Sequence, residues 1–114
     1  MSLNTSPVFA YGTLLDNHIQ LEVFGRLLTG VPDQLYGFVL RQRAVAATYP
    51  DIFPSPDSDS RVSGMRLELQ PEELLLADTY ETDLYTREWV TLDSGTEAWV
   101  YMGAGNNPKI SNEI

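Results

Sequence analysis

A short apolar run near the N-terminus, Val8-Phe9-Ala10-Tyr11, constrains this chain most, because Gly12 stops it at once. Such a run predicts a buried strand, and the glycine predicts a tight turn after it. A helix is expected next, since Asp16 or Asn17 can cap its N-terminus and apolar residues then recur at helical spacing up to about Gly30. The residues of this apolar stripe are Ile19, Val23, Phe24, Leu27 and Leu28.

Extended structure is predicted in four further segments, from apolar or alternating runs bounded by turn residues. These strands are expected over residues 33–47, 61–69, 85–92 and 97–102. Between the last two, Asp93-Ser94-Gly95-Thr96 is typical of a hairpin turn. Residues 49–60 contain three prolines and three aspartates, so we expect a loop there. The tail over residues 103–114 is predicted to be irregular.

A second helix is expected to begin at Pro71, which needs no N–H in the first turn, and to end near residues 80–83. Leu74, Asp78 and Glu81 follow the spacing i, i+4, i+7, so an inward Leu74 would draw both acids toward the core. A carboxyl held there beside a like charge has a raised pKa and exchanges protons near neutrality. The alternative is two solvated acids at a helix end, or an acid paired with Arg87 for stability alone.

The composition limits the classes of function. With 114 residues, the chain fits a single domain over 1–114, with a core over about residues 8–102. Seven basic and sixteen acidic residues give a net charge of -9, which argues against nucleic acid and anionic membranes as partners. The absence of cysteine excludes thiolate chemistry, and the single histidine, His18, argues against a His-rich metal site. Without a leader or an apolar span, a cytoplasmic location is expected.

The turn over Tyr11-Gly12-Thr13-Leu14 is the first candidate site. Backbone N–H groups at a strand-to-helix turn can bind a carboxylate or a phosphate. It is not a phosphate-binding Walker loop, because no Gly-Lys-Ser/Thr follows, and it lacks the three glycines of a dinucleotide site. The alternative is an ordinary turn between a strand and a helix.

Five motifs in this order resemble the γ-glutamylcyclotransferase-like (AIG2-like) family, which includes γ-glutamylamine cyclotransferases. They are Phe9-Ala10-Tyr11-Gly12-Thr13-Leu14, Val62-Ser63-Gly64, Asp78-Thr79-Tyr80-Glu81, Tyr85-Thr86-Arg87 and Trp99-Val100-Tyr101. The resemblance implies an α+β fold with a small mixed β-barrel-like sheet and flanking helices. It also implies that Glu81 is the catalytic acid/base, that the turn over 11–14 binds the substrate, and that Tyr101 lines the cavity. The residue after the glutamate departs from the family pattern, since Thr82 replaces a small residue or glycine.

The resemblance further implies conversion of a small-molecule γ-glutamyl amine or γ-glutamyl amino acid to 5-oxoproline and a free amine. The nucleophile is the substrate's own α-amine, so the reaction needs neither a cofactor nor a metal. Two alternatives remain open, namely a binding or regulatory module of the same fold and an enzyme acting on a specialised substrate. The sequence names neither the leaving amine nor the oligomeric state.

Overall fold

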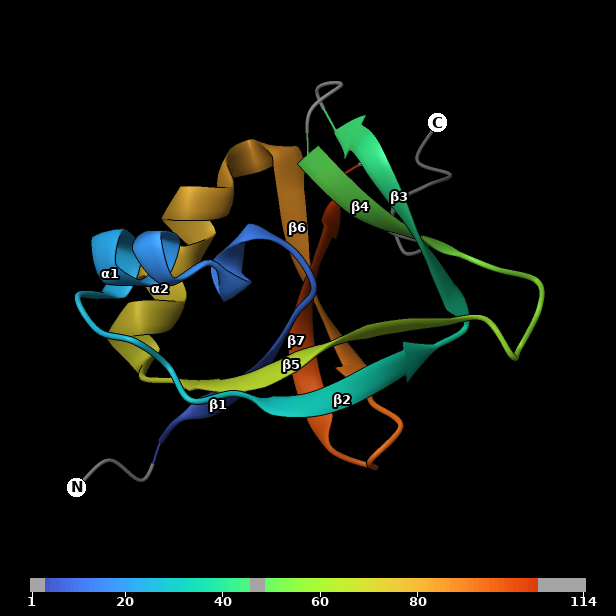
Figure 1. Cartoon of the computed structure of the whole chain (residues 1–114), viewed down its shortest axis with the longest axis horizontal. Helices are drawn as coiled ribbons and strands as arrows, with labels where there is room; N and C mark the ends of the chain where they lie inside the picture. Colours follow the sequence, from blue (N-terminus) through green and yellow to red (C-terminus); the bar gives the residue numbers. More distant parts are fainter. Residues whose placement is uncertain (1–3, 46–48, 105–114) are drawn as a thin grey trace.

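A five-stranded mixed sheet forms the centre of the computed structural model, which describes residues 4–45 and 49–104 (Figure 1). Its strands are β1 (Ser6–Ala10), β2 (Val31–Tyr36), β5 (Arg61–Leu69), β6 (Tyr85–Thr91) and β7 (Glu97–Gly103). They lie in the order β2-β5-β1-β7-β6, in which β1 and β7 are parallel and every other neighbouring pair is antiparallel. The expected α+β class with a small mixed sheet is thus confirmed, and the described strands form an open sheet, not a closed barrel.

A separate two-stranded sheet pairs β3 (Phe38–Val45) with β4 (Tyr49–Pro54). Two predictions are wrong here. The strand expected over 33–47 is divided at Gly37, whose φ of 85° turns the chain from one sheet to the other, and residues 46–48 lie outside the described residues. Residues 49–54, expected to be loop, form β4. Proline is tolerated there because Pro54 ends the strand, and β4 pairs on one side only.

Two helices pack on one face of the five-stranded sheet, α1 (Asn17–Phe24) and α2 (Pro71–Glu81) (Figure 1). Asp16 caps α1 as expected, because its Oδ1 accepts a hydrogen bond from the His18 N–H at 2.8 Å. The helix ends earlier than predicted, at Gly25, whose φ of 74° is the left-handed conformation of a helix C-cap. Leu27 therefore lies outside the helix and is exposed. Neither α1 nor α2 is long and apolar enough to cross a membrane.

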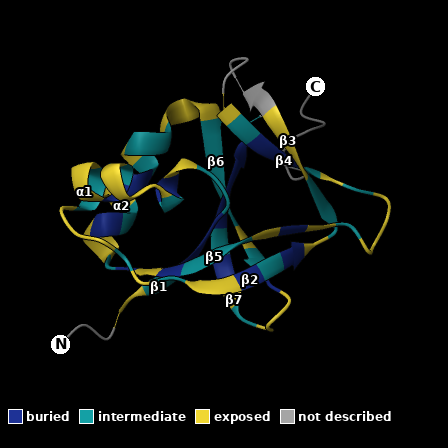
Figure 2. Ribbon diagram, viewed as in Figure 1, coloured by how far each residue is buried: buried dark blue, intermediate teal, exposed yellow. Residues whose placement is uncertain are grey.

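The core has two layers because successive side chains of a strand point to opposite faces. Val8 and Ala10 of β1 pack toward the helices, together with Ala77 of α2. Phe9 points the other way and packs with Ile52 of β4, so the β3–β4 sheet covers the second face. Figure 2 shows the buried residues along the middle of the strands and on the inner sides of the helices. β1 is therefore covered on both faces, and the turn that follows it emerges between the layers.

Gly64 allows β5 to approach β1 closely where β1 ends. A Cβ at this position would lie 2.4 Å from the backbone oxygen of Ala10 and 2.8 Å from the ring of Phe9. The backbone atom cannot move aside without disturbing the sheet, so only glycine fits. This close contact fixes the end of β1 and the start of the turn over 11–14.

Candidate functional site

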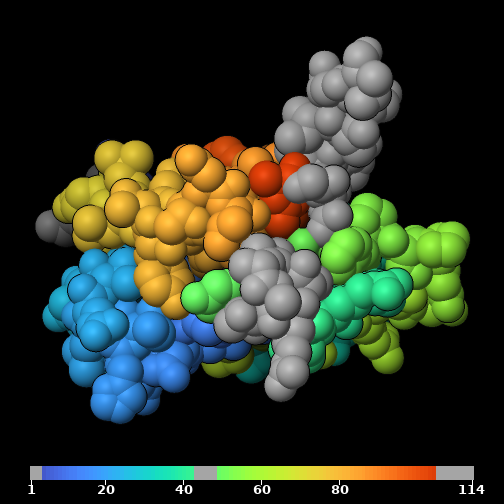
Figure 3. All heavy atoms as spheres, turned by 90° about the horizontal axis from the view of Figure 1, so that it is seen from above, coloured from blue at the N-terminus to red at the C-terminus, as the bar shows by residue number. Residues whose placement is uncertain are grey.

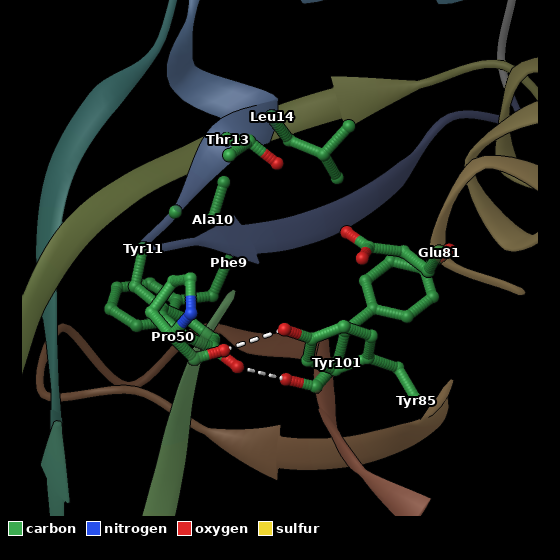
Figure 4. A pocket seen from close by; sticks show the side chains of 10 residues that line it. Phe9, Ala10, Tyr11, Thr13, Leu14, Pro50, Glu81, Tyr85 and Tyr101 are labelled. Carbon is green, nitrogen blue, oxygen red and sulfur yellow. Dashed lines mark hydrogen bonds between the residues drawn. The ribbon is translucent and has the colours of Figure 1, made fainter. Parts of the chain in front are cut away.

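A small cavity of about 30 Å³ lies between the turn after β1 and the C-terminal end of α2 (Figure 4). We call it the inner cavity. Its lining residues are Phe9, Ala10, Tyr11, Gly12, Thr13, Leu14, Pro50, Glu81, Tyr85 and Tyr101. The fold therefore brings the predicted turn, Glu81 and Tyr101 to one place, although they are far apart in the sequence. Their chemical roles stay predictions at this point.

The turn continues into a short 3-10 helix, η1 (Thr13–Leu15). The Leu15 N–H donates a hydrogen bond to the Gly12 carbonyl at 3.0 Å and so fixes the backbone of the turn. No described residue accepts a hydrogen bond from the N–H groups of Gly12, Thr13 or Leu14. Both helices clamp the turn. The amide Nε2 of Gln20 in α1 donates to the Leu14 carbonyl at 2.8 Å. The hydroxyls of Thr13 and Tyr80, the latter in α2, are 2.7 Å apart. Three backbone donors are thus fixed in place beside the inner cavity.

Gly12 does not adopt the positive φ that would make glycine obligatory, because its φ is -136°. A Cβ at this position would instead lie 3.2 Å from Cγ of Pro50. Pro50, in β4, lies beside Tyr11 and also lines the inner cavity. Glycine at residue 12 therefore lets the turn lie against Pro50 without displacing it.

Glu81 is the last residue of α2, and its carboxylate points into the space between the turn and the tyrosine rings (Figure 4). Burial raises the pKa of Glu81 from 4.5 to about 7. No described residue forms a hydrogen bond or an ion pair with this carboxylate. Near neutral pH the protonated and the ionised forms of Glu81 are therefore both populated. A residue that removes a proton and later returns it must be able to adopt both forms.

Asp78 does not join Glu81 in the inner cavity, which corrects the idea of two coupled acids. Its Oδ1 accepts a hydrogen bond from the Tyr101 hydroxyl at 2.6 Å, and its Oδ2 lies 3.2 Å from Nη2 of Arg87. The like charge is not among the causes of the raised pKa of Glu81, which is burial. Asp78 therefore matches the alternative interpretation of the sequence, in which an acid of this helix pairs with Arg87 and stabilises the fold.

Three tyrosines form the wall of the inner cavity and are held by their hydroxyls. The hydroxyl of Tyr11 donates to the Tyr101 carbonyl at 2.5 Å, and that of Tyr85 donates to the Pro50 carbonyl at 2.6 Å (Figure 4). The pKa of each of the three hydroxyls is raised above its ordinary value of 10.0, first of all by burial. These phenols stay protonated near neutrality, so Glu81 is the group in the inner cavity that titrates there.

Pro50 and Tyr85 belong to the inner cavity, but the sequence did not indicate either as a site residue. Pro50 is placed by its neighbour Asp51, which is buried. The Oδ1 of Asp51 accepts hydrogen bonds from its own strand at Ile52 and, at 2.8 Å, from the N–H of Gly103 in β7. An aspartate between prolines gives no local sign of such burial. Tyr85 stands in the predicted strand over 85–92 and in the motif Tyr85-Thr86-Arg87, but neither observation assigned it to the site.

Comparisons with known proteins show which family and which folds this chain is similar to. A family model described as "Gamma-glutamyl cyclotransferase, AIG2-like" matches residues 8–113. Among curated proteins, none matches the sequence significantly. Two Arabidopsis thaliana proteins with solution structures have similar folds. One is 24% identical, with a TM-score of 0.77 over 97% of this chain and 70% of the other. The second is 26% identical, with a TM-score of 0.78 over 96% and 76%. A solved structure named gamma-glutamyl cyclotransferase is 18% identical, with a TM-score of 0.73 over 88% and 67%.

Proposed function

The chain belongs to the gamma-glutamyl cyclotransferase, AIG2-like family, and on that premise we propose that it converts a γ-glutamyl amine or γ-glutamyl amino acid to 5-oxoproline and a free amine. One observation carries the proposal. The partly buried carboxyl of Glu81 has a pKa of about 7 and lines the same cavity as residues 12–14, whose three backbone N–H groups have no described acceptor. A base that titrates near neutrality and a set of fixed donors are the two parts that this cyclisation requires.

In the proposed reaction, the carboxylate of Glu81 removes a proton from the substrate's α-ammonium group. The neutral α-nitrogen then attacks the γ-carbonyl carbon, and a new C–N bond closes a five-membered ring. The bond between that carbon and the amide nitrogen breaks, and Glu81 returns its proton to the leaving nitrogen. The ring nitrogen gives up its second proton, which passes through Glu81 to the released amine, so the amine leaves as an ammonium ion. Atoms and charge balance without water or a co-reactant. Because the reaction is intramolecular, holding the substrate in a folded conformer supplies much of the rate.

The N–H groups of residues 12–14 hold a negatively charged part of the substrate, either its α-carboxylate or the oxyanion that develops on the γ-carbonyl oxygen. The same three residues, Gly12, Thr13 and Leu14, line the inner cavity that Glu81 also lines. Donors that are already in place stabilise such charge without rearranging.

The test is an assay of 5-oxoproline with γ-glutamyl amino acids, γ-glutamyl amines, γ-glutamyl-ε-lysine and glutathione. Glu81→Gln keeps the size of the side chain but removes the base, so turnover should fall on the order of 10²- to 10⁴-fold. Glu22→Gln is the matched control, because Glu22 is exposed on α1 away from the inner cavity. Thermal melts of all three proteins show whether folding is intact.

Two results would count against the proposal. Full activity in a folded Glu81→Gln protein would remove Glu81 from the reaction. Binding of γ-glutamyl compounds without any 5-oxoproline from the wild type would favour the binding or regulatory module instead.

A further inference from the structure

Gln20 is the most deeply buried residue of α1, at 3% exposure, and it carries a polar side chain. A helix that packs on a sheet normally buries apolar side chains. Burial of an amide is unfavourable unless its polar atoms are hydrogen-bonded. An apolar residue of similar size would pack at this position as well, so the hydrogen bonds of Gln20 are what distinguish it.

Both ends of the Gln20 amide are paired, which fixes its orientation. Nε2 donates to the Leu14 carbonyl at 2.8 Å, and Oε1 accepts from the Leu28 N–H at 2.9 Å. The flipped amide would set acceptor against acceptor at Leu14 and donor against donor at Leu28, so one orientation alone satisfies all four groups. Gln20 thereby ties the turn before α1 to the segment after it. In Figure 3 the turn and α1, coloured blue, lie together against α2, coloured yellow to gold.

The bond to Leu14 reaches a donor of the turn through two peptide planes. The Leu14 carbonyl and the Leu15 N–H belong to one peptide and point in opposite directions, because a trans peptide is planar. That N–H donates to the Gly12 carbonyl at 3.0 Å. The Gly12 carbonyl shares its peptide with the N–H of Thr13, which points the opposite way and has no described acceptor. Gln20 therefore begins a hydrogen-bonded series that ends in a free backbone donor of the inner cavity, and each bond of such a series polarises the next.

The backbone of the turn does not hold the Leu14–Leu15 peptide by its carbonyl. The preceding carbonyl, that of Thr13, accepts from the Asp16 N–H at 2.9 Å, so the turn itself fixes that peptide. Among the described residues, the Leu14 carbonyl accepts from the Gln20 side chain alone. Loss of the Gln20 amide consequently leaves this peptide free to rotate, and the Gly12–Thr13 peptide bonded to it loses a support.

From this geometry, and resting on the proposed function, we infer that Gln20 is a positioning residue of the reaction. It orients the Leu14–Leu15 peptide and, through the Gly12 carbonyl, aims the Thr13 N–H at the negatively charged part of the substrate. Gln20 does not itself line the inner cavity, so it acts through the backbone of the turn. A backbone donor stabilises charge most effectively when it is already in place and does not have to reorient.

Gln20→Met tests the inference, because methionine has nearly the same length but has no N–H to donate. We expect kcat/KM for γ-glutamyl compounds to fall about 10- to 100-fold in the folded protein, which is the size of effect that a displaced binding group produces. Gln20→Asn is the second variant, for use if the methionine protein does not fold. It keeps an amide but is one methylene shorter, so it cannot reach Leu14 and Leu28 together, and it should show a loss of the same order.

Asp33→Ala is the matched control for lost stability. Asp33 is also a buried polar residue, 9% exposed, and its carboxylate accepts hydrogen bonds from Arg66 and Ser94. It lies in β2 and does not line the inner cavity. Asp33→Ala should lower the melting temperature, as the Gln20 variants do, but keep kcat/KM within about twofold of the wild type when all proteins are assayed well below their melting temperatures. An equal loss of kcat/KM in Asp33→Ala and Gln20→Met would overturn the inference.

Nuclear magnetic resonance of nitrogen-15-labelled protein gives a readout at the donor itself. The probe is 5-oxoproline, which carries the α-carboxylate of the proposed substrates. Its titration should shift the amide proton of Thr13 in the wild type and in Asp33→Ala. In Gln20→Met this shift should be lost, and the dissociation constant should rise about 3- to 10-fold, as weakening of one hydrogen bond to a charged group would cause.

The two measurements separate failure of this inference from failure of the proposed function. If the wild type releases no 5-oxoproline, but its Thr13 amide responds to the probe and that of Gln20→Met does not, the proposed reaction fails and the positioning role stands. If the wild type is active and Gln20→Met keeps its kcat/KM within about twofold, or keeps the Thr13 response, the positioning role fails and the reaction stands. A Thr13 amide that does not respond in the wild type also overturns the positioning role.

Discussion

Burial of Glu81 has a thermodynamic consequence that needs no substrate. The folded protein keeps the Glu81 proton up to a pKa of about 7, whereas the unfolded chain releases it near the ordinary value of 4.5. Between these values the folded state binds more protons, so the free energy of unfolding falls as the pH rises. The stabilisation is fully present below pH 4.5 and is lost as the pH rises through about 7. It amounts to about 3 kcal/mol, of which about 2.5 kcal/mol is lost between pH 5 and pH 8.

Urea unfolding of the wild type and of Glu81→Gln, at pH 5 and at pH 8, measures this loss. The glutamine does not titrate, so the variant should gain about 2.5 kcal/mol relative to the wild type over that range. Other carboxyls affect both proteins alike and cancel in the comparison. Glu22→Gln, at an exposed site, should follow the wild type within about 0.5 kcal/mol. An unchanged difference between wild type and Glu81→Gln at the two pH values would refute the argument that burial raises this pKa.

Three further substitutions test contacts that hold the sheet together or line the inner cavity. Gly64→Ala should lower the free energy of unfolding by about 1–3 kcal/mol in urea, because its Cβ would meet the backbone oxygen of Ala10 at 2.4 Å. Asp33→Ala should cost about 2–4 kcal/mol, since it leaves the hydrogen-bonded Arg66 and Ser94 without their partner, and an unchanged urea midpoint would contradict this. Gly12→Ala should raise KM for γ-glutamyl substrates several-fold with little change in the melting temperature, because its methyl group would press on Pro50 and shift this part of the lining of the inner cavity.

The parts of the fold that the sequence predicted are those with local causes. β1 is a continuous apolar run, β5 alternates, and α2 begins at a proline followed by two acids. The hairpin of β6 and β7 turns at Gly95, whose φ is 90°. For the site, the spacing of Leu74 and Glu81 on α2 correctly indicated that Glu81 turns inward, because helix geometry alone sets which residues share a face.

The parts that the sequence missed depend on partners distant in the chain. β4 exists because β3 pairs with it, and its prolines argue against a strand unless that pairing is known. Asp51 is buried because the N–H of Gly103 meets it across the fold. The helix expected to reach about Gly30 ends at Gly25, because the left-handed conformation of this glycine stops it. Asp78 shares a face of α2 with Glu81, but it binds Tyr101 of β7 and Arg87 of β6 and so does not reach the inner cavity.

The pH dependence of 5-oxoproline release tests the central claim most directly, because kcat/KM reports the ionisation of the free enzyme's essential groups. The base form of Glu81 starts the reaction, so kcat/KM should rise with pH along an acid limb whose apparent pKa is about 7. The residual activity of Glu81→Gln should lack this limb. An acid limb near the ordinary pKa of 4.5, or one that persists in Glu81→Gln, would contradict the account of Glu81 as the partly buried acid and base of this site.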